Sequence, residues 1–93
     1  MRLSEIEHQL IRQAIIDIDP EADIYLFGSR TNDHAKGGDI DVLVISKKIS
    51  LIDKLTILAK LHLRLGEQKI DLVVFPDLTR PFARIAQQGG IAL

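Results

Sequence analysis

The sequence contains no cysteine and no tryptophan, and it has only three phenylalanines and one tyrosine. Without cysteine the chain has neither disulfides nor thiolate zinc ligands, so its stability must come from packing or from a partner subunit. Thirteen acidic residues nearly balance twelve basic ones, and the net charge of −1 gives no general attraction for duplex DNA. We therefore expect no strong nucleic-acid binding.

Long apolar runs are also missing. No window approaches the roughly 20 apolar residues of a membrane helix, and the charged start of the chain lacks the apolar core of a signal peptide. We therefore expect a cytoplasmic protein that makes no membrane contact.

The residues that are present are typical of a small folded globule. The chain has 93 residues, of which 46% are hydrophobic and 27% charged, with no repeat or low-complexity stretch. We expect a single domain over residues 1–93. A domain of this size buries only about 60–65% of its unfolded surface, so it has little apolar area to spare.

Hydrophobic periodicity predicts an α/β domain in the order αβαβαβα. A capping box at Ser4 and Glu7 begins the first helix, and Asp19-Pro20 ends it. The segment 39–45 (DIDVLVI) is apolar on both faces beyond its two aspartates, which is typical of a central strand. The predicted helices span residues 4–18, 50–65 and 79–88, and the predicted strands span 24–27, 39–45 and 69–75. The fourth helix of this order is a short one expected after Gly28-Ser29.

The helix predicted over residues 50–65 carries more apolar side chains than a single stripe of about 100° can hold. Two interpretations stay open. Either a small sheet needs a broad cover, or part of this helix contacts another chain, which includes a homo-oligomer.

Asp39 and Asp41 are two residues apart on a predicted strand, so both should point to the same face. Two carboxylates about 5 Å apart at an effective dielectric near 20 repel by roughly 3 kcal/mol, a large share of the stability of a small domain. A hard divalent cation removes this cost, because Mg²⁺ prefers oxygen ligands from one or two carboxylates and from phosphate. For the Asp-x-Asp pattern alone, solvated or turn-capping carboxylates are the alternative.

A third carboxylate follows on another apolar strand. Asp71 stands beside Ile70 and Leu72, where aspartate is disfavoured unless it faces a site. If this strand lies next to that of Asp39 and Asp41, the three carboxylates gather as the ligands of a two-metal phosphoryl or nucleotidyl transfer site. A charge at the rim of an edge strand is the alternative for Asp71.

Gly28-Ser29-Arg30 follows the first predicted strand. Glycine permits a tight turn and close approach, the backbone amides and the Ser29 hydroxyl can face a phosphate, and arginine matches phosphate oxygens. A plain turn is the alternative for Gly28-Ser29. The pattern is neither the Walker P-loop nor the dinucleotide-binding glycine motif.

Together, Gly28-Ser29-Arg30, the segment Asp39-Ile40-Asp41 and the later Asp71 resemble the minimal nucleotidyltransferase family of the polymerase-beta-like superfamily. The match covers about residues 22–75. The resemblance implies a small mixed sheet with helices packed on one face and an exposed site on the other. Two features depart from the family: Gly38 stands where many relatives place serine, and nine residues separate Ser29 from Asp39 where ten are common.

The resemblance also implies a mechanism. Asp39, Asp41 and Asp71 would hold Mg²⁺, in a two-metal site or with Mn²⁺ as the alternative, and Asp71 would help to activate the acceptor. Gly28, Ser29 and Arg30 would bind the nucleoside triphosphate, with ATP the expected substrate.

Many relatives neutralise a helical HEPN-domain toxin, some by adenylylating a tyrosine, so a HEPN-domain partner and an antitoxin role are expected. Two alternatives stay open. One is a non-catalytic nucleotide-binding subunit that neutralises its partner by binding, and the other is a nucleotidyltransferase acting on a small molecule.

Overall fold

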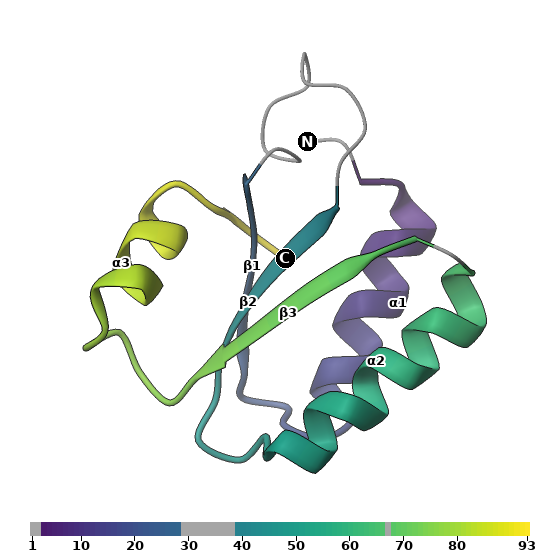
Figure 1. The fold of residues 1–93 in the computed structure, drawn as a ribbon, viewed down its shortest axis with the longest axis horizontal. Helices are drawn as coiled ribbons and strands as arrows, with labels where there is room; N and C mark the ends of the chain where they lie inside the picture. The colour runs from purple at the N-terminus through teal and green to yellow at the C-terminus, as the bar shows by residue number, and fades with distance from the viewer. Residues whose placement is uncertain (1–2, 29–38, 67) are drawn as a thin grey trace.

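The computed structural model describes residues 3–28, 39–66 and 68–93. Within these ranges, three helices and four strands follow one another in the order αββαβαβ (Figure 1). The six elements predicted with residue ranges are present, and one short strand follows them. The short helix predicted after Gly28-Ser29 lies outside the described residues. The helices are α1 (Glu5–Ile16), α2 (Leu51–Leu65) and α3 (Pro81–Gln88). The strands are β1 (Asp23–Phe27), β2 (Ile40–Ile45), β3 (Ile70–Phe75) and β4 (Ile91–Ala92).

The helix ends follow from local chemistry. Ser4 caps α1 and Ser50 caps α2, and in both cases the side chain three residues later returns a hydrogen bond to the backbone of the cap. Gly66 ends α2 with a positive φ of 72°, and Pro81 begins α3. These signals were all readable in the sequence, and the structure confirms them.

The four strands form one mixed sheet in the order β3-β2-β1-β4. β1 is antiparallel to β2 and β4, whereas β2 and β3 are parallel and joined through α2. The mixed α/β sheet predicted from the sequence is confirmed, with β2 in its interior. β4 was not predicted.

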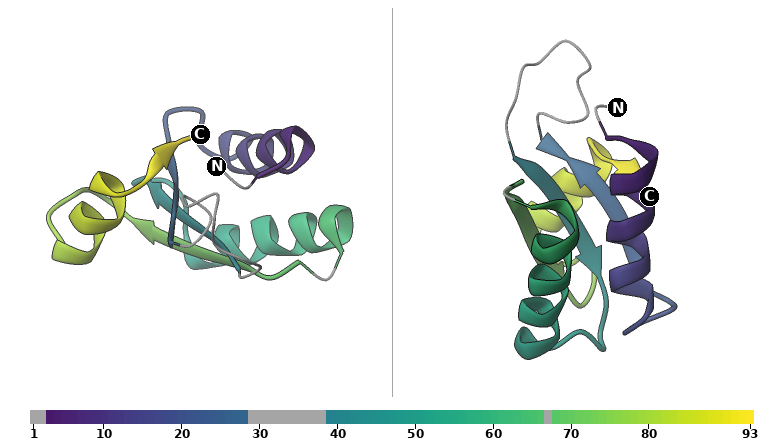
Figure 2. Two further views of the ribbon diagram at one scale, coloured as in Figure 1. Left: turned by 90° about the horizontal axis from the view of Figure 1, so that it is seen from above. Right: turned by 90° about the vertical axis from the view of Figure 1, so that its right-hand side faces the viewer.

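One face of the sheet is covered by α1 and α2, which lie together in all three views (Figures 1 and 2). Alternate residues of the three long strands meet the inner stripes of these helices and form the main core. Its members are Ile11, Ala14, Ile15, Ile24, Leu26, Ile40, Val42, Val44, Ile57, Leu61 and Leu72. This face fixes the register of β1, β2 and β3, since a slip of one residue would turn every core side chain outward.

The third helix departs from the expectation that all helices pack on one face. Phe82 of α3 packs against Phe27 and Phe75, whose strand positions alternate with the core residues and therefore face away from α1 and α2. Leu43 is fully buried on this second face, and Ala83 and Ala86 are the buried residues of α3. α3 thus covers part of the face that carries the predicted site.

α2 keeps a second apolar stripe in solvent. Ile52, Leu55 and Leu63 are 75%, 58% and 83% exposed, while Ile57 and Leu61 on the opposite side of the helix are buried. This exposed stripe does not cover the sheet, and a contact between it and another chain stays a prediction. Within the described ranges, no helix is both long and apolar enough to cross a bilayer.

Candidate active site

Two of the predicted carboxylates are neighbours across the sheet. Asp41 of β2 lies opposite Asp71 of β3 in the parallel register, and on its other side it lies opposite Phe27 of β1. Residues opposite each other point to the same face. Asp41 and Asp71 therefore project together from the face that α1 and α2 leave open.

Asp39 stands just before β2 and has a different partner. Its Oδ2 is 3.4 Å from Nζ of Lys69, which precedes β3, and both side chains are well exposed to solvent. A hydrogen bond from the backbone N–H of Ile40 to the carbonyl of Lys69, 3.0 Å long, joins the two strand starts. The alternation of Lys69 and Asp71 along one strand could have shown that Lys69 borders the site, but the sequence reasoning missed it.

The pKa of Asp41 is raised above its ordinary value. Partial burial is the largest cause, followed by the negative charge of Asp71, a hydrogen bond with the Asp71 side chain and the charge of Asp39. Lys69 acts in the opposite direction. The protein thus holds a carboxylate where two others oppose its charge, which is the arrangement expected of a cation or catalytic site.

Gly28, directly after β1, lies against the carboxylate of Asp41. It has a positive φ of 75°, and a Cβ atom built there would run into Oδ2 of Asp41. A residue without a side chain is therefore required for the backbone to approach this carboxylate so closely. The predicted nucleotide-binding residues Ser29 and Arg30, like Gly38, lie outside the described residues.

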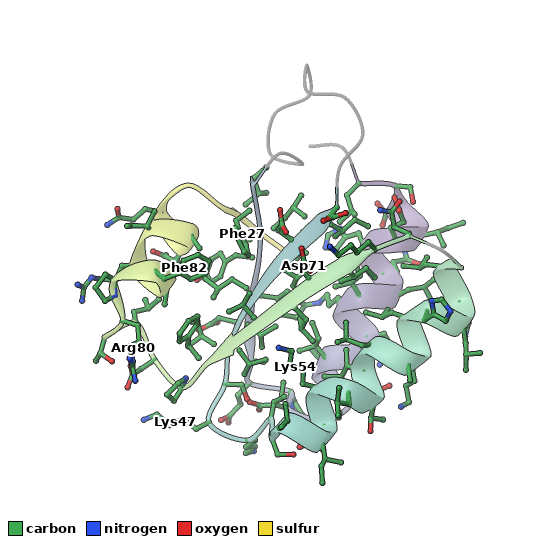
Figure 3. The ribbon with its side chains drawn as sticks, viewed as in Figure 1. Phe27, Lys47, Lys54, Asp71, Arg80 and Phe82 are labelled. Carbon is green, nitrogen blue, oxygen red and sulfur yellow. The ribbon has the colours of Figure 1, made fainter. Side chains whose placement is uncertain are left out.

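A shallow cavity of about 480 Å³ opens beside the two carboxylates. It is lined by Asp41 and Asp71, by Phe27 and Phe82 on the α3 side, and by Lys54 and Leu58 of α2 beyond β3. Figure 3 shows Phe27 and Phe82 together on one side of Asp71, with Lys54 on the side of α2. The sequence reasoning did not identify Phe27, Phe82 or Lys54.

Asp41 and Asp71 fit a divalent cation in their chemistry. Two adjacent carboxylates match the one or two that Mg²⁺ takes from a protein before water and substrate phosphate complete its shell. In the described part of the chain, no group of three or more His, Cys, Asp or Glu side chains is gathered to hold a metal ion. The structure brings together Asp41 and Asp71, whereas the joint ligand set with Asp39 stays a prediction.

The mixed sheet, the paired carboxylates and the close glycine describe a small α/β domain with a two-carboxylate site on the face that α1 and α2 leave open. A comparison with family models gives this class of domain a name. The model of the nucleotidyltransferase domain matches residues 8–92, so the chain belongs to this family. Nucleotidyl transfer is the activity of the family, a nucleotide is the substrate it implies, and divalent metal is its typical cofactor. No curated protein matches the chain.

Proposed function

We propose that this protein transfers AMP from ATP to a hydroxyl group at the site formed by Asp41 and Asp71, with Asp39 as a further ligand of Mg²⁺. The observation that carries the proposal is the pairing of Asp41 with Asp71 across β2 and β3, in a chain that matches the family over most of its length. The close approach of Gly28 to Asp41 supports a phosphate position at the end of β1.

In the proposed reaction the acceptor oxygen bonds to the α-phosphorus, and the bond from that phosphorus to the bridging oxygen of pyrophosphate breaks. Pyrophosphate leaves with the electron pair, and Asp71 takes the proton of the acceptor hydroxyl. A divalent cation bound to the carboxylates would act as a Lewis acid toward the phosphate oxygens. Asp41 would hold this cation together with Asp71 and Asp39, and Gly28 would let the triphosphate approach the backbone.

The proposed acceptor is a tyrosine of a HEPN-domain partner, which would make the protein an antitoxin. The resemblance of the Gly-Ser and Asp-x-Asp motifs to minimal nucleotidyltransferases supports this partner. The open, shallow form of the cavity beside the carboxylates supports it too, because ligand pockets usually enclose most of a small molecule.

The test is incubation of the purified protein with radiolabelled ATP, Mg²⁺ and the product of a neighbouring gene that encodes a HEPN-domain protein. We expect label on the partner with wild type and with Asp23→Asn, a control aspartate on the same sheet face at the far end of β1. Asp41→Asn should abolish the label. Equal labelling by Asp41→Asn and wild type would sink the proposal, and neutralisation of the partner without any labelling would favour a binding subunit.

A further inference from the structure

The three phenylalanines of the chain form one cluster around Phe82, and two of them, Phe27 and Phe82, line the cavity beside the carboxylate pair. The ring of Phe82 makes an edge-on contact with Phe27, with centroids 5.8 Å apart and planes at 84°, and a tilted contact with Phe75 at 6.0 Å. Both separations lie in the range of favourable aromatic pairs. Two rings on two strands therefore fix the position of Phe82 on α3.

Phe82 is nevertheless 49% exposed, and it lines the same cavity as Asp41 and Asp71. A ring that only anchored α3 would be expected to turn fully inward, as Ala83 and Ala86 do. Ile85 on the same helix is 70% exposed but does not line this cavity. Among the exposed apolar residues of α3, Phe82 is thus the one that borders the carboxylates.

We propose that Phe82 is a stacking platform for a planar aromatic ring of a substrate, held beside the reacting phosphate. The inference rests on the proposed function and adds the chemical class of the group that the site recognises. A neutral ring suits this place, because the carboxylates repel anions while the apolar cavity wall of Phe27, Val73 and Phe82 favours a flat apolar group.

Two substrates of the proposed reaction carry such a ring, namely the nucleobase of the triphosphate and a phenolic acceptor. Both offer Phe82 a flat aromatic ring for stacking, whereas an aliphatic hydroxyl acceptor has no such ring. Phe27, which contacts Phe82, is followed directly by Gly28, which lies against Asp41 at the expected phosphate position. The platform therefore borders the part of the site where the phosphate is expected.

The absence of tryptophan from the chain allows a direct test. Phe82→Trp introduces the only tryptophan of the chain on the platform, and Ile85→Trp places one on the same helix away from the cavity. Tryptophan is excited at a wavelength that tyrosine does not absorb. Each protein is titrated with Mg²⁺ and a non-hydrolysable ATP analogue, with Mg²⁺ and tripolyphosphate, with N-acetyltyrosinamide and with N-acetylserinamide. We expect quenching or a spectral shift only in Phe82→Trp and only with ligands that contain a ring.

Comparing the four titrations shows whether the ring on the platform comes from the nucleobase or from the acceptor. A response to the ATP analogue but not to tripolyphosphate assigns the platform to the nucleobase, and a response to the tyrosine derivative but not to the serine derivative assigns it to the acceptor. Silence of Phe82→Trp toward both ring ligands, or an equal response of Ile85→Trp, overturns the proposal.

Kinetics give a second readout. Phe82→Leu should raise the KM of the ring-bearing substrate about tenfold, as expected for loss of one stacking contact, with kcat little changed, and Phe82→Tyr should restore it. Unchanged KM values in Phe82→Leu would contradict the platform while leaving the transferase intact. Absence of transfer by wild type would contradict the proposed function, whereas the fluorescence titration would still test the platform.

Discussion

Two aspartates at opposite ends of the sheet are held in contrasting ways. Asp19, before β1, is 3% exposed and accepts hydrogen bonds from the Ser46 hydroxyl at 2.5 Å and from the backbone of Glu21. Its pKa is lowered, with the Ser46 hydrogen bond as the largest cause. Asp41, at the other end, has a raised pKa because it is partly buried among like charges.

The difference distinguishes an aspartate that stabilises the fold from one that belongs to the candidate active site. The Ser46 hydroxyl also accepts hydrogen bonds from the backbone of Lys48 and Ile49, so the Asp19 end ties the α1–β1 turn to the β2–α2 turn. The Asp19 carboxylate is thus held by partners that stabilise both its charge and the fold. At the Asp41 end the fold tolerates charge repulsion, which is the pattern expected where a site needs its charges for a ligand.

The largest predicted effect is that of Asp41→Asn. Transfer should fall about a thousandfold, because a bound cation contributes several kcal/mol to such reactions and each 1.36 kcal/mol is a factor of ten in rate. In chemical denaturation without divalent metal, the free energy of unfolding should rise, since a repelled charge is removed.

Asp19→Asn is the matched control for that experiment. Its free energy of unfolding should fall, and its activity per folded molecule should stay near that of wild type. If Asp41→Asn destabilised the protein as Asp19→Asn does, the contrast between the two ends would be wrong.

The second largest effect is expected from Gly28→Ala. Activity should fall about a hundredfold, as expected when a reacting group is displaced by about 1 Å. The new Cβ would meet the carboxylate of Asp41 at a positive φ that only glycine adopts easily. Steady-state kinetics measure the loss, and circular dichroism should still show the folded domain. Full activity in Gly28→Ala would mean that this close approach has no role.

A smaller effect is expected when the free energy of unfolding is measured at acidic pH. Because the folded pKa of Asp19 is lowered, its contribution to stability is full above the unfolded pKa of about 3.9 and is lost as the pH falls through the folded pKa. Ser46→Ala removes the main cause of the shift, so its urea midpoint should fall less steeply between neutral pH and pH about 2. Parallel curves for the two proteins would count against the Asp19–Ser46 pair.

The smallest effect should come from Leu63→Gln on the exposed stripe of α2. The side chain is 83% exposed, so the free energy of unfolding should change by no more than about 0.5 kcal/mol. Sedimentation velocity of the same variant and of wild type tests whether the stripe holds two copies together. A loss of several kcal/mol in a monomeric protein would show that the stripe belongs to the core.

Much of the fold could be predicted because its signals are local. Capping residues, glycine and proline stops, and alternating apolar residues mark six of the predicted elements, and the structure contains all six. β4 has only two residues, and its pairing with β1 depends on Gly90, where a Cβ would meet the carbonyls of Ala86 and Leu26. Such a close approach exists only in the folded chain.

In the candidate site, too, some residues could be predicted from local signals and others could not. Asp41 and Asp71 could be predicted because strand alternation and parallel neighbours fix which face they share. Phe82 could not, because the packing of α3 on the sheet decides that its ring borders the cavity. The ion pair between Asp39 and Lys69 could not be predicted from strand alternation either, because Lys69 lies at the start of the neighbouring strand.

The most direct test of nucleotidyl transfer is to compare ATP labelled on the α-phosphate with ATP labelled on the γ-phosphate, in the presence of Mg²⁺ and the partner protein. Our account predicts that the acceptor retains label only from the α-phosphate, that pyrophosphate is released in equal amount, and that EDTA stops both. Retention of label from the γ-phosphate instead would identify a kinase-type transfer and contradict the account.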